Sequence, residues 1–359
     1  MNIELGLLLR HLLAAMRSLT RRGPRAAMGS AAALSVGTAV TLALMLRLQA
    51  PYWAGLSAFI CIQASQPQSL RKALHRILGT LLGAAAALLV FPWIAYDSVA
   101  TMLLLFLAGT LAILGALLST YSYAWLLGCL TLIMVVLASL DNPELTLSFA
   151  IFRAAEITLG SATALTVAYL TLPGGEGPVT PGPGWRSLLG SNAHMLPHAT
   201  RAGLTIALVP LVWRVFELPD LSQMAISISV VMAVPALTGD PHRDSHAIAQ
   251  RAAERVTGCI IGAGAGLAVL ALPCATLFPF WLAALMIAAW ITAQLQTGPH
   301  GMPMVGLQSM MAFILTVVQG WGPALTLTPA IERAAGMILA VSMLLAINLI
   351  LGPPKAATA

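Results

Sequence analysis

Charge is what this sequence has least of. Charged side chains make up only 8% of its 359 residues, against roughly a quarter in ordinary soluble domains. Hydrophobic residues make up 59%, and the mean hydropathy is +0.89. A soluble chain of this length needs far more polar side chains to cover its core. The composition therefore argues against a cytosolic enzyme, a nucleic-acid-binding protein and a disulfide-rich secreted domain, and it predicts a surface that faces lipid.

The motifs of common catalytic and cofactor sites are also missing. The sequence has no Gly-x-x-x-x-Gly-Lys-Ser/Thr loop, no Gly-x-Ser-x-Gly elbow and no His-Glu-x-x-His pair. Its four cysteines form no Cys-x-x-Cys pair, and Cys61, Cys129 and Cys259 lie inside apolar runs. We therefore expect no cofactor, no metal and no enzymatic activity. Without a phosphate-binding loop, the chain cannot drive transport by hydrolysing ATP itself.

Long apolar segments are abundant, and they fall into two sets of six. A membrane-spanning helix needs about 20 apolar residues, so we predict an all-α membrane protein with about 12 transmembrane helices. A stretch rich in proline and glycine separates the two sets and is predicted to be a cytoplasmic linker, residues 172–198. The predicted membrane repeats are residues 26–171 and 199–352, followed by a cytoplasmic tail at 353–359. The segments lie at about 26–48, 52–67, 77–96, 98–118, 122–139, 150–171, 200–216, 221–238, 256–273, 278–296, 304–320 and 330–351.

The first 25 residues combine apolar residues at helical spacing with basic residues between and after them. A helix with this pattern has an apolar stripe and a basic face. Such helices lie in the membrane interface, next to the anionic lipids of the cytoplasmic leaflet. We therefore predict an amphipathic interfacial helix over residues 1–25, with membrane lipid as its partner. Its basic residues are Arg10, Arg17, Arg21, Arg22 and Arg25.

Arginine and glycine landmarks recur in the same order in both sets, which indicates an internal duplication. Six helices per repeat is an even number, so both repeats enter the membrane from the same side and are parallel. The paired glycines of each third helix are predicted to let neighbouring helices approach closely. The matching residues are Arg76, Gly79 and Gly83 with Arg255, Gly258 and Gly262, and Arg153 with Arg333.

The distribution of basic residues predicts the orientation. Cytoplasmic loops of membrane proteins carry an excess of lysine and arginine. If the N-terminus is cytoplasmic, most of the 18 basic residues fall on the inner side, and we predict that both termini are cytoplasmic. The inner set is Arg10, Arg17, Arg21, Arg22, Arg25, Arg71, Lys72, Arg76, Arg186, Arg201, Arg243, Arg251, Arg255 and Lys355.

The remaining charges inside apolar segments are candidates for function. A charge within the membrane costs roughly 2.5–3.5 kcal/mol on insertion scales, so each one needs a reason. Arginines at matching positions could attract an anion along a central path, since a guanidinium holds a carboxylate through two parallel hydrogen bonds. A glutamate beside them could carry a proton. The substrate-path candidates are Arg76, Arg153, Arg255, Arg333, Gln63, Tyr52 and Trp53, and the proton-coupling candidates are Glu156, Glu332 and Glu254.

Each candidate also has a structural interpretation. Arg76 and Arg255 are predicted at the inner starts of their helices, where they could simply anchor the chain. Arg153 sits three residues before Glu156 and could serve only as its ion-pair partner. Tyr52 and Trp53 could both belong to the aromatic belt at the membrane surface.

A histidine-containing segment at 239–246 invites comparison with a metal site. His242 and His246 are four residues apart, with Asp240 and Asp244 nearby. Pro241 argues against a fixed helical face there. We therefore predict a solvated cytoplasmic loop and no metal.

One stretch of the first repeat resembles a known family. A Pro-Tyr-Trp-Ala-Gly-Leu opening (51–56) is followed by Gln-Ala-Ser (63–65) and by Arg-Lys-Ala-Leu-His-Arg-Ile-Leu-Gly-Thr-Leu-Leu-Gly (71–83). This pattern resembles the fusaric acid resistance / aromatic acid exporter family of bacterial inner-membrane transporters. The second repeat matches more loosely, through Arg251, Arg255, Gly258 and Gly262, and it has Leu221-Ser222 where the first has the Tyr-Trp pair.

The resemblance implies export of aromatic or other organic acid anions from the bacterial cytoplasm, driven by the proton gradient. It also implies a periplasmic adaptor of the membrane-fusion type as a partner. Larger members carry a sizeable cytoplasmic domain where this chain has only its short linker. Two alternatives remain open: a passive organic-anion channel, and a non-transporting membrane assembly partner of an adaptor. The oligomeric state is left open by the sequence.

Overall fold

The computed structural model describes residues 10, 14–175, 182–216, 221–233, 240–298, 303–320, 322–323 and 328–351. Within these ranges the chain is almost entirely helical. The described strands are two residues long each, β1 (Val318–Gln319) and β2 (Gly322–Pro323), and they pair antiparallel. The predicted all-α fold is confirmed.

The helices follow the order of the predicted apolar segments. Those of the first repeat are α2 (Pro24–Met45), α3 (Pro51–Cys61), α4 (Gln66–Ile94), α5 (Ser98–Leu118), α6 (Ser122–Asp141), η1 (Pro143–Leu145) and α7 (Thr146–Thr171). The rest are η2 (Trp185–Leu189), α8 (Met195–Ala207), α9 (Val209–Phe216), α10 (Leu221–Met232), α11 (Pro241–Leu270), α12 (Phe278–Gln296), α13 (Pro303–Val317) and α14 (Thr328–Leu351).

Membrane-spanning length is reached repeatedly along the chain. Among the residues that the structure describes, nine helical segments are long and apolar enough to cross a membrane. This confirms a multi-pass α-helical membrane protein. Every predicted apolar segment coincides with at least one helix, and the division into twelve spans in two parallel repeats stays a prediction.

Two helices, α4 and α11, begin much earlier than their apolar segments indicate. α4 begins at Gln66 and α11 begins at Pro241, so Arg76 and Arg255 lie within these helices and not at their starts. The loop predicted at 239–246 is therefore wrong from Pro241 onward. A proline is well placed in the first turn of a helix, because the amide hydrogen it lacks would have no partner there. Asp244 in the first turn of α11 also suits the positive end of the helix dipole.

Part of the predicted linker is ordered. α7 ends at Thr171, η2 forms a short 3-10 helix at Trp185–Leu189, and α8 begins at Met195. Residues 185–189 and 195–198 are therefore helical, although the sequence predicts no regular structure in 172–198. Residues 176–181 lie outside the described part of the chain.

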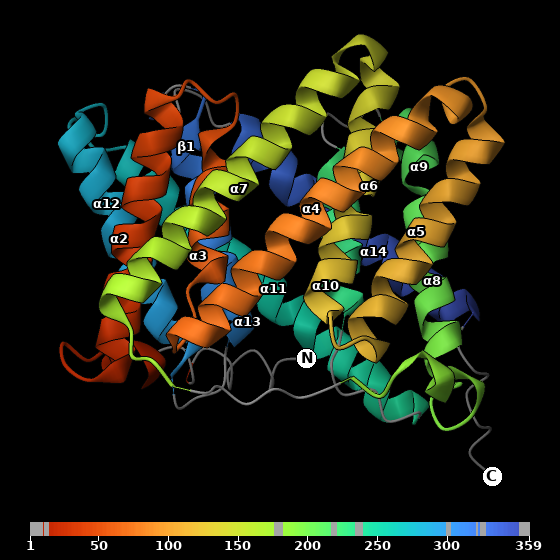
Figure 1. Ribbon diagram of the computed structural model, residues 1–359, viewed down its shortest axis with the longest axis horizontal. Coiled ribbons are helices and arrows are strands. Elements are labelled where there is room, and N and C mark those ends of the chain that lie inside the picture. Colours follow the sequence, from red (N-terminus) through yellow and green to blue (C-terminus); the bar gives the residue numbers. More distant parts are fainter. Residues whose placement is uncertain are drawn as a thin grey trace. The chain divides into compact units, whose positions relative to one another are not determined.

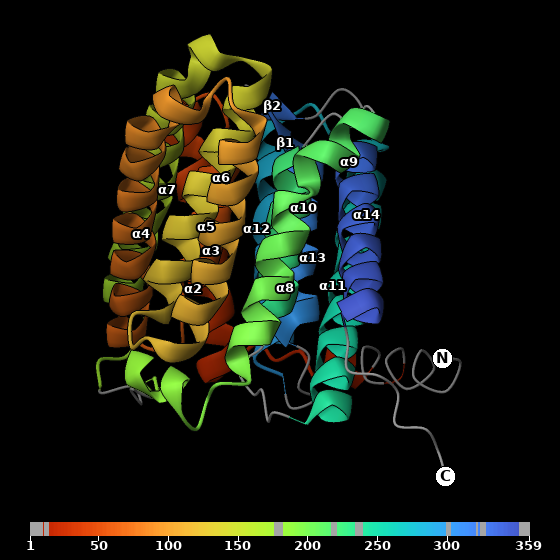
Figure 2. The ribbon, with the colours of Figure 1, turned by 90° about the vertical axis from the view of Figure 1, so that its right-hand side faces the viewer.

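The chain forms two compact units, and each takes helices from both repeats. In the first unit, α2 and α3 pack with α12 and α13 (Figure 1). In the second unit, α5 and α6 pack with α8 and α10 (Figure 2). The first unit comprises residues 1–77, 152–178 and 253–330, and the second comprises residues 78–151, 179–252 and 331–359.

The helix pairings of the two units correspond to one another under the predicted duplication. In the first unit, the first two helices of repeat one contact the fourth and fifth helices of repeat two, α12 and α13. In the second unit the roles are exchanged: α8 and α10, which open repeat two, contact α5 and α6 of repeat one. Each unit therefore contains an interface between the two repeats.

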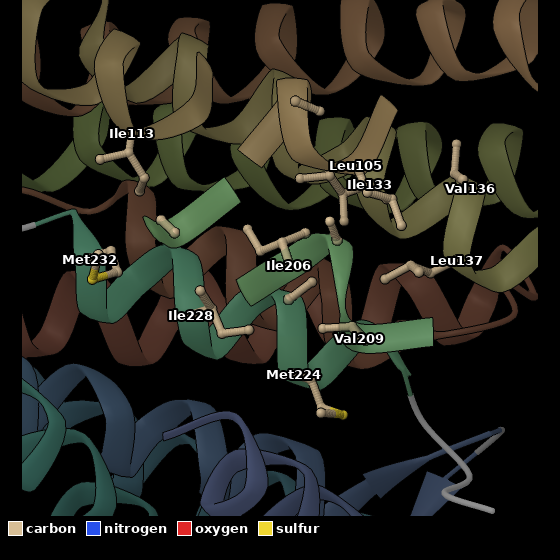
Figure 3. Packing of buried hydrophobic residues seen from close by; sticks show 14 of the residues in the cluster. Leu105, Ile113, Ile133, Val136, Leu137, Ile206, Val209, Met224, Ile228 and Met232 are labelled. Carbon is tan, nitrogen blue, oxygen red and sulfur yellow. The ribbon is translucent and has the colours of Figure 1, made fainter. Parts of the chain in front are cut away.

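The core of the second unit lies between these helices (Figure 3). Leu105 of α5, Ile133 of α6, Ile206 of α8 and Ile228 of α10 pack in one apolar cluster and are almost completely buried. Because lipid is itself apolar, moving these side chains out of lipid gains little, and close packing between the helices stabilises the cluster. The cluster is built from both repeats, as the pairings require.

Glycines allow the closest helix contacts. A Cβ added at Gly83 of α4 would overlap the carbonyl of Gly128 in α6, and one at Gly262 of α11 would overlap the carbonyl of Ser309 in α13. In both repeats the third helix thus uses a glycine to contact the fifth helix. The predicted packing role is confirmed at these positions.

Candidate functional site

The candidate site is built around α3, a helix too short to cross a membrane. Its 11 residues extend about 17 Å at 1.5 Å per residue, and the hydrocarbon core is about 30 Å thick. Nearly all of its side chains are buried. Some secondary transporters place the ends of short, interrupted helices at their substrate and ion sites. What binds the ends of α3 therefore indicates what the site is suited to hold.

A carboxylate from α7 binds the amino end of α3. Oε1 of Glu156 accepts a hydrogen bond of 2.7 Å from the backbone N–H of Ala50, the residue that precedes the helix. Glu156 is 2% exposed. A negative charge is stabilised there because the amino end of a helix is the positive end of its dipole. Glu156 thus caps α3 from a neighbouring helix.

Arg153 lies on the same face of α7, three residues before Glu156. The central carbon of its guanidinium lies 3.1 Å from the centroid of the Trp53 ring, and opposite charges three residues apart on a helix attract each other. Arg153 is 4% exposed and Trp53 is 8% exposed. Trp53 is therefore the buried support of a cation, which distinguishes it from an exposed belt residue.

The next turns of α3 continue the same polar face. Ser57 lies one turn after Trp53; its hydroxyl donates to the Trp53 carbonyl at 2.7 Å and accepts from Nε of Arg76 at 3.0 Å. Another turn on, the Cys61 thiol donates to the Ser161 hydroxyl at 3.6 Å. The cations of α4 and α7 therefore contact successive turns of one helix. We call Trp53, Ser57, Arg76, Arg153 and Glu156 the α3 cluster.

The carboxyl end of α3 is capped by Gln63. Its amide nitrogen donates to the carbonyls of Ile60 at 3.1 Å and Ile62 at 2.6 Å, and its backbone N–H donates to the Ser69 hydroxyl. These bonds satisfy carbonyls that a helix leaves without intrahelical partners. The structure thus places Gln63 as a cap with its amide donors already in use.

The matching arginine of repeat two has a different environment. Nη1 of Arg255 donates to Oε1 of Gln308 at 2.6 Å, and Nε2 of that glutamine donates to the Cys259 sulfur at 2.8 Å. Arg255 is 1% exposed, so simple anchoring at a helix start does not describe it. Both α11 and α13 lie in the first unit at these residues.

The short helix of repeat two, α10, ends in a similar way within the second unit. Its 12 residues are also too few to cross the membrane. Nε of Arg251 donates to the Val230 carbonyl at 3.0 Å, and Nε2 of His198 donates to the Met232 carbonyl at 2.8 Å. Polar side chains of neighbouring helices therefore contact one end of each short helix: Glu156 at the amino end of α3, and Arg251 and His198 at the carboxyl end of α10.

The structure places six of the sequence candidates at α3, with Gln63 at its carboxyl end and five others along it. Tyr52, Trp53, Arg76, Arg153 and Glu156 all lie at α3, with the Tyr52 ring centroid 5.4 Å from that of Trp53.

The other candidates are placed separately. Arg255 contacts Gln308, and Glu254 precedes it in α11, half-buried. The backbone of Glu332 and Arg333 is helical in α14, and their side chains lie outside the described part of the structure.

Sequence reasoning missed three contributors to the site. Ser57 contacts Arg76, Ser161 contacts Cys61, and the Ala50 amide contacts Glu156. The spacing of Trp53, Ser57 and Cys61, four residues apart, is the one signal that could have identified a polar helical face. A backbone donor such as that of Ala50 leaves no signal in a sequence.

The chemistry of the α3 cluster suits an anion with an aromatic group. Arg153 and the amino end of α3 both favour a carboxylate, and Glu156 supplies one. The rings of Tyr52 and Trp53 lie next to that position, with their centroids 5.4 Å apart. A buried arginine stays protonated, so the positive charge persists whichever carboxylate is bound.

These features define a multi-pass α-helical membrane protein with cationic side chains buried against a short helix. Residues 31–180 match the sequence profile of the fusaric acid resistance protein family, which confirms the predicted family over that segment. The matched segment contains the whole α3 cluster, and it covers less than half of the chain. Searches of curated proteins and of solved structures gave no match. The family match supports a role in membrane transport, and a transporter family is consistent with the prediction that the chain is not an enzyme.

Proposed function

We propose that this protein exports aromatic or other organic acid anions across the bacterial inner membrane. One observation carries the proposal: Arg153, buried in a membrane helix, lies on the Trp53 ring beside Glu156, which binds the amino end of α3. The family match covers these residues. The cost of burying a charge in the membrane makes a purely incidental arginine there a poor explanation.

In this proposal the carboxylate of the substrate binds Arg153 through two parallel hydrogen bonds. Its ring lies against Trp53 and Tyr52, and the α3 amino end stabilises its charge. Glu156 occupies that position when substrate is absent. The substrate and Glu156 therefore compete for the same arginine and the same helix end.

Glu156 is the proposed proton-exchanging group. When it takes up a proton it no longer competes for Arg153, so the charge on Glu156 controls the binding of the anion. Glu254 and Glu332 are the corresponding candidates in repeat two. Arg76, Arg255 and Arg333 are the proposed further contacts along the anion path, with Arg76 reaching the turn of α3 that follows Trp53.

Accumulation of acids in cells tests the export proposal. Cells that lack the protein receive wild type, Arg153→Gln or empty vector and are exposed to a panel of aromatic carboxylates. Wild type should lower the intracellular concentration of at least one acid, and Arg153→Gln should behave as empty vector. Equal accumulation in all three strains across the panel would overturn the proposal.

A passive anion channel is the alternative, and the driving force separates it from an exporter. An uncoupler that dissipates the proton gradient should abolish uphill export by a proton-coupled exporter. A channel would follow only the electrochemical gradient of the anion itself, with the uncoupler acting solely through the membrane potential.

The orientation and the partner are further parts of the proposal. The basic residues of the predicted inner loops support cytoplasmic termini. A reporter that is active only in the cytoplasm should therefore be active when it is fused to either end of the chain. The family resemblance extends the proposal to a periplasmic adaptor of the membrane-fusion type. Cross-linking in intact cells, followed by purification of the tagged transporter, should recover such an adaptor.

A further inference from the structure

An apolar groove lies on the first unit between α11, α12 and α13. It has a volume of about 560 Å³, and its walls include Ala265 of α11, Ala284 and Ile287 of α12 and Phe313 of α13. Along α12 the lining runs from Phe280 to Leu295, which corresponds to about 22 Å at 1.5 Å per residue. The groove therefore covers most of the depth of a hydrocarbon core and is long enough for one extended acyl chain.

Two hydroxyls interrupt the apolar lining. Thr292 donates to the Ala288 carbonyl at 2.7 Å, which leaves its oxygen able to accept. Ser309 is 1% exposed, and its hydroxyl has no hydrogen-bond partner among the described residues. A buried hydroxyl without a partner is costly. An ester carbonyl placed at this end of the groove would supply an acceptor for Ser309.

A basic hollow adjoins the same end. Arg10, Ala14, Arg17 and Ser18 line a second hollow of about 420 Å³, and Met16, next to Arg17, lines the apolar groove. Arg10 and Arg17 both line this hollow, and two positive charges there attract an anion. Their side chains are exposed.

The N-terminal segment is held in place on the first unit. The backbone N–H of Thr20 donates to Oε1 of Gln294 at 2.9 Å, and Nη2 of Arg25 donates to the Gln294 carbonyl at 3.1 Å. Ala15 packs against Leu295 and Val305. These contacts hold the basic hollow next to the apolar groove.

We infer that the groove binds one acyl chain of an anionic phospholipid whose phosphate lies at Arg10 and Arg17. The charge of the hollow selects an anionic headgroup, the hydroxyls of Thr292 and Ser309 lie where the ester region would be, and the groove takes the chain. The lipid would hold the N-terminal segment against α11 and α12. This inference does not rest on the proposed transport function.

Native mass spectrometry of the purified full-length protein tests this inference. Phosphatidylglycerol and phosphatidylcholine with identical acyl chains are titrated into the detergent-solubilised protein. We expect phosphatidylglycerol to bind about 30-fold more tightly, since each arginine near a membrane surface adds about fivefold to the binding of an anionic lipid. The Arg10→Ala/Arg17→Ala variant should lose this preference. The matched control is Arg21→Ala/Arg22→Ala, which changes two exposed arginines outside the hollow and should keep it.

The groove itself is tested by filling it. Ala284→Phe should weaken the binding of both lipids at least tenfold, and the gentler Ala265→Leu keeps the test valid if the larger side chain prevents folding. Leu74→Phe, at an exposed apolar position on α4, is the matched control and should bind as wild type. Equal binding of the two lipids by wild type would overturn the inference. Unchanged binding in folded Ala284→Phe and Ala265→Leu would also overturn it. Displacement of the lipid by benzoate, or a dimer that forms through the groove and excludes lipid, would overturn it as well.

Discussion

At the residue scale, the α3 cluster concentrates scarce charge at the end of one short helix. Arg153 and Glu156 are both buried within α7, where each charge costs roughly 2.5–3.5 kcal/mol on insertion scales. The contacts with Trp53 and with the Ala50 amide offset part of this cost. The same groups that stabilise Glu156 would stabilise the carboxylate of a substrate. If Glu156 is only structural, its substitution should leave the pH dependence of transport unchanged. If Glu156 exchanges a proton, its substitution should change that pH dependence.

Glu156→Gln should flatten the pH dependence of transport. The amide oxygen of glutamine can still accept the hydrogen bond from Ala50, and the side chain can no longer exchange a proton. In wild type we expect anion binding to strengthen as the pH falls, because protonation removes the competing carboxylate. The measurement is the apparent substrate affinity between pH 5 and 8, with the protein level in the membrane as a check on folding.

Glu144→Gln is the matched control for this variant. Glu144 is exposed in η1 and makes no contribution to the α3 cluster, so its substitution should leave the pH profile unchanged. A folded Glu156→Gln protein with the wild-type pH profile would remove Glu156 from the proton-exchange step.

Trp53→Leu should weaken the apparent affinity for aromatic carboxylates by about tenfold or more. A desolvated cation–π contact contributes about 2 kcal/mol, and the ring is also the proposed surface for the substrate. Aliphatic carboxylates should lose less, since they make no ring contact. Competition assays with benzoate and with an aliphatic acid measure the difference.

The control for the tryptophan is Trp93→Leu. Trp93 lies near the end of α4 and is 86% exposed, as a side chain in contact with lipid would be. Its replacement should leave both affinities unchanged. An equal loss for aromatic and aliphatic acids in Trp53→Leu would show that Trp53 acts only as a structural support for Arg153.

At the scale of elements, glycines determine how closely the third and fifth helices of each repeat pack. Gly83 faces Gly128 in the second unit, and Gly262 faces Ser309 in the first unit. Because these contacts involve backbone carbonyls, the neighbouring atoms cannot move aside as the tip of a side chain would. Helix positions in both units therefore depend on single glycines.

Gly262→Ala should destabilise the protein by about 1–3 kcal/mol, the usual cost of forcing extra atoms into a packed contact. Gly264 provides a control in the same helix, because nothing lies within 4 Å of a Cβ added there. Gly264→Ala should be neutral or slightly stabilising, since alanine favours a helix over glycine by about 1 kcal/mol. Thermal unfolding of the two purified variants tests the contrast, and equal melting temperatures would contradict the packing described for α11 and α13.

The sequence predicted the elements better than their contacts. Apolar runs located helices at all twelve predicted segments, because length and hydropathy decide which stretches enter a membrane. The starts of α4 and α11 were missed because their first turns are polar and carry no apolar signal. Arg153 and Glu156 were identified from charge scarcity, whereas the roles of Ser57 and the Ala50 amide depend on tertiary contacts that periodicity cannot reveal.

At the scale of the whole molecule, the two repeats are not the two compact units. α2 and α3 pack with α12 and α13, and α5 and α6 pack with α8 and α10. A repeat on its own would lack the partners of its first two helices and of its fourth and fifth. Neither repeat should therefore be stable alone, although each has six predicted segments and its own apolar content.

Expression of the chain as two fragments, 1–180 and 181–359, tests this arrangement. The break lies in the predicted linker, so all the helix pairings remain possible when both fragments are present. Co-expressed fragments should purify together, and either fragment alone should be degraded or aggregate. Recovery of a monodisperse, helical 1–180 fragment by itself would contradict the pairings between repeats.

The central claim is that Arg153 binds the substrate anion during transport. Its most direct test is the initial flux of radiolabelled benzoate into proteoliposomes that contain the purified full-length protein. Wild type should show saturable flux, Arg153→Gln should show only the flux of protein-free liposomes, and Arg153→Lys should retain a part because it keeps the charge without the two parallel hydrogen bonds. Arg214→Gln, at an exposed arginine of α9, should transport as wild type. Wild-type flux in a folded Arg153→Gln protein would contradict the claim.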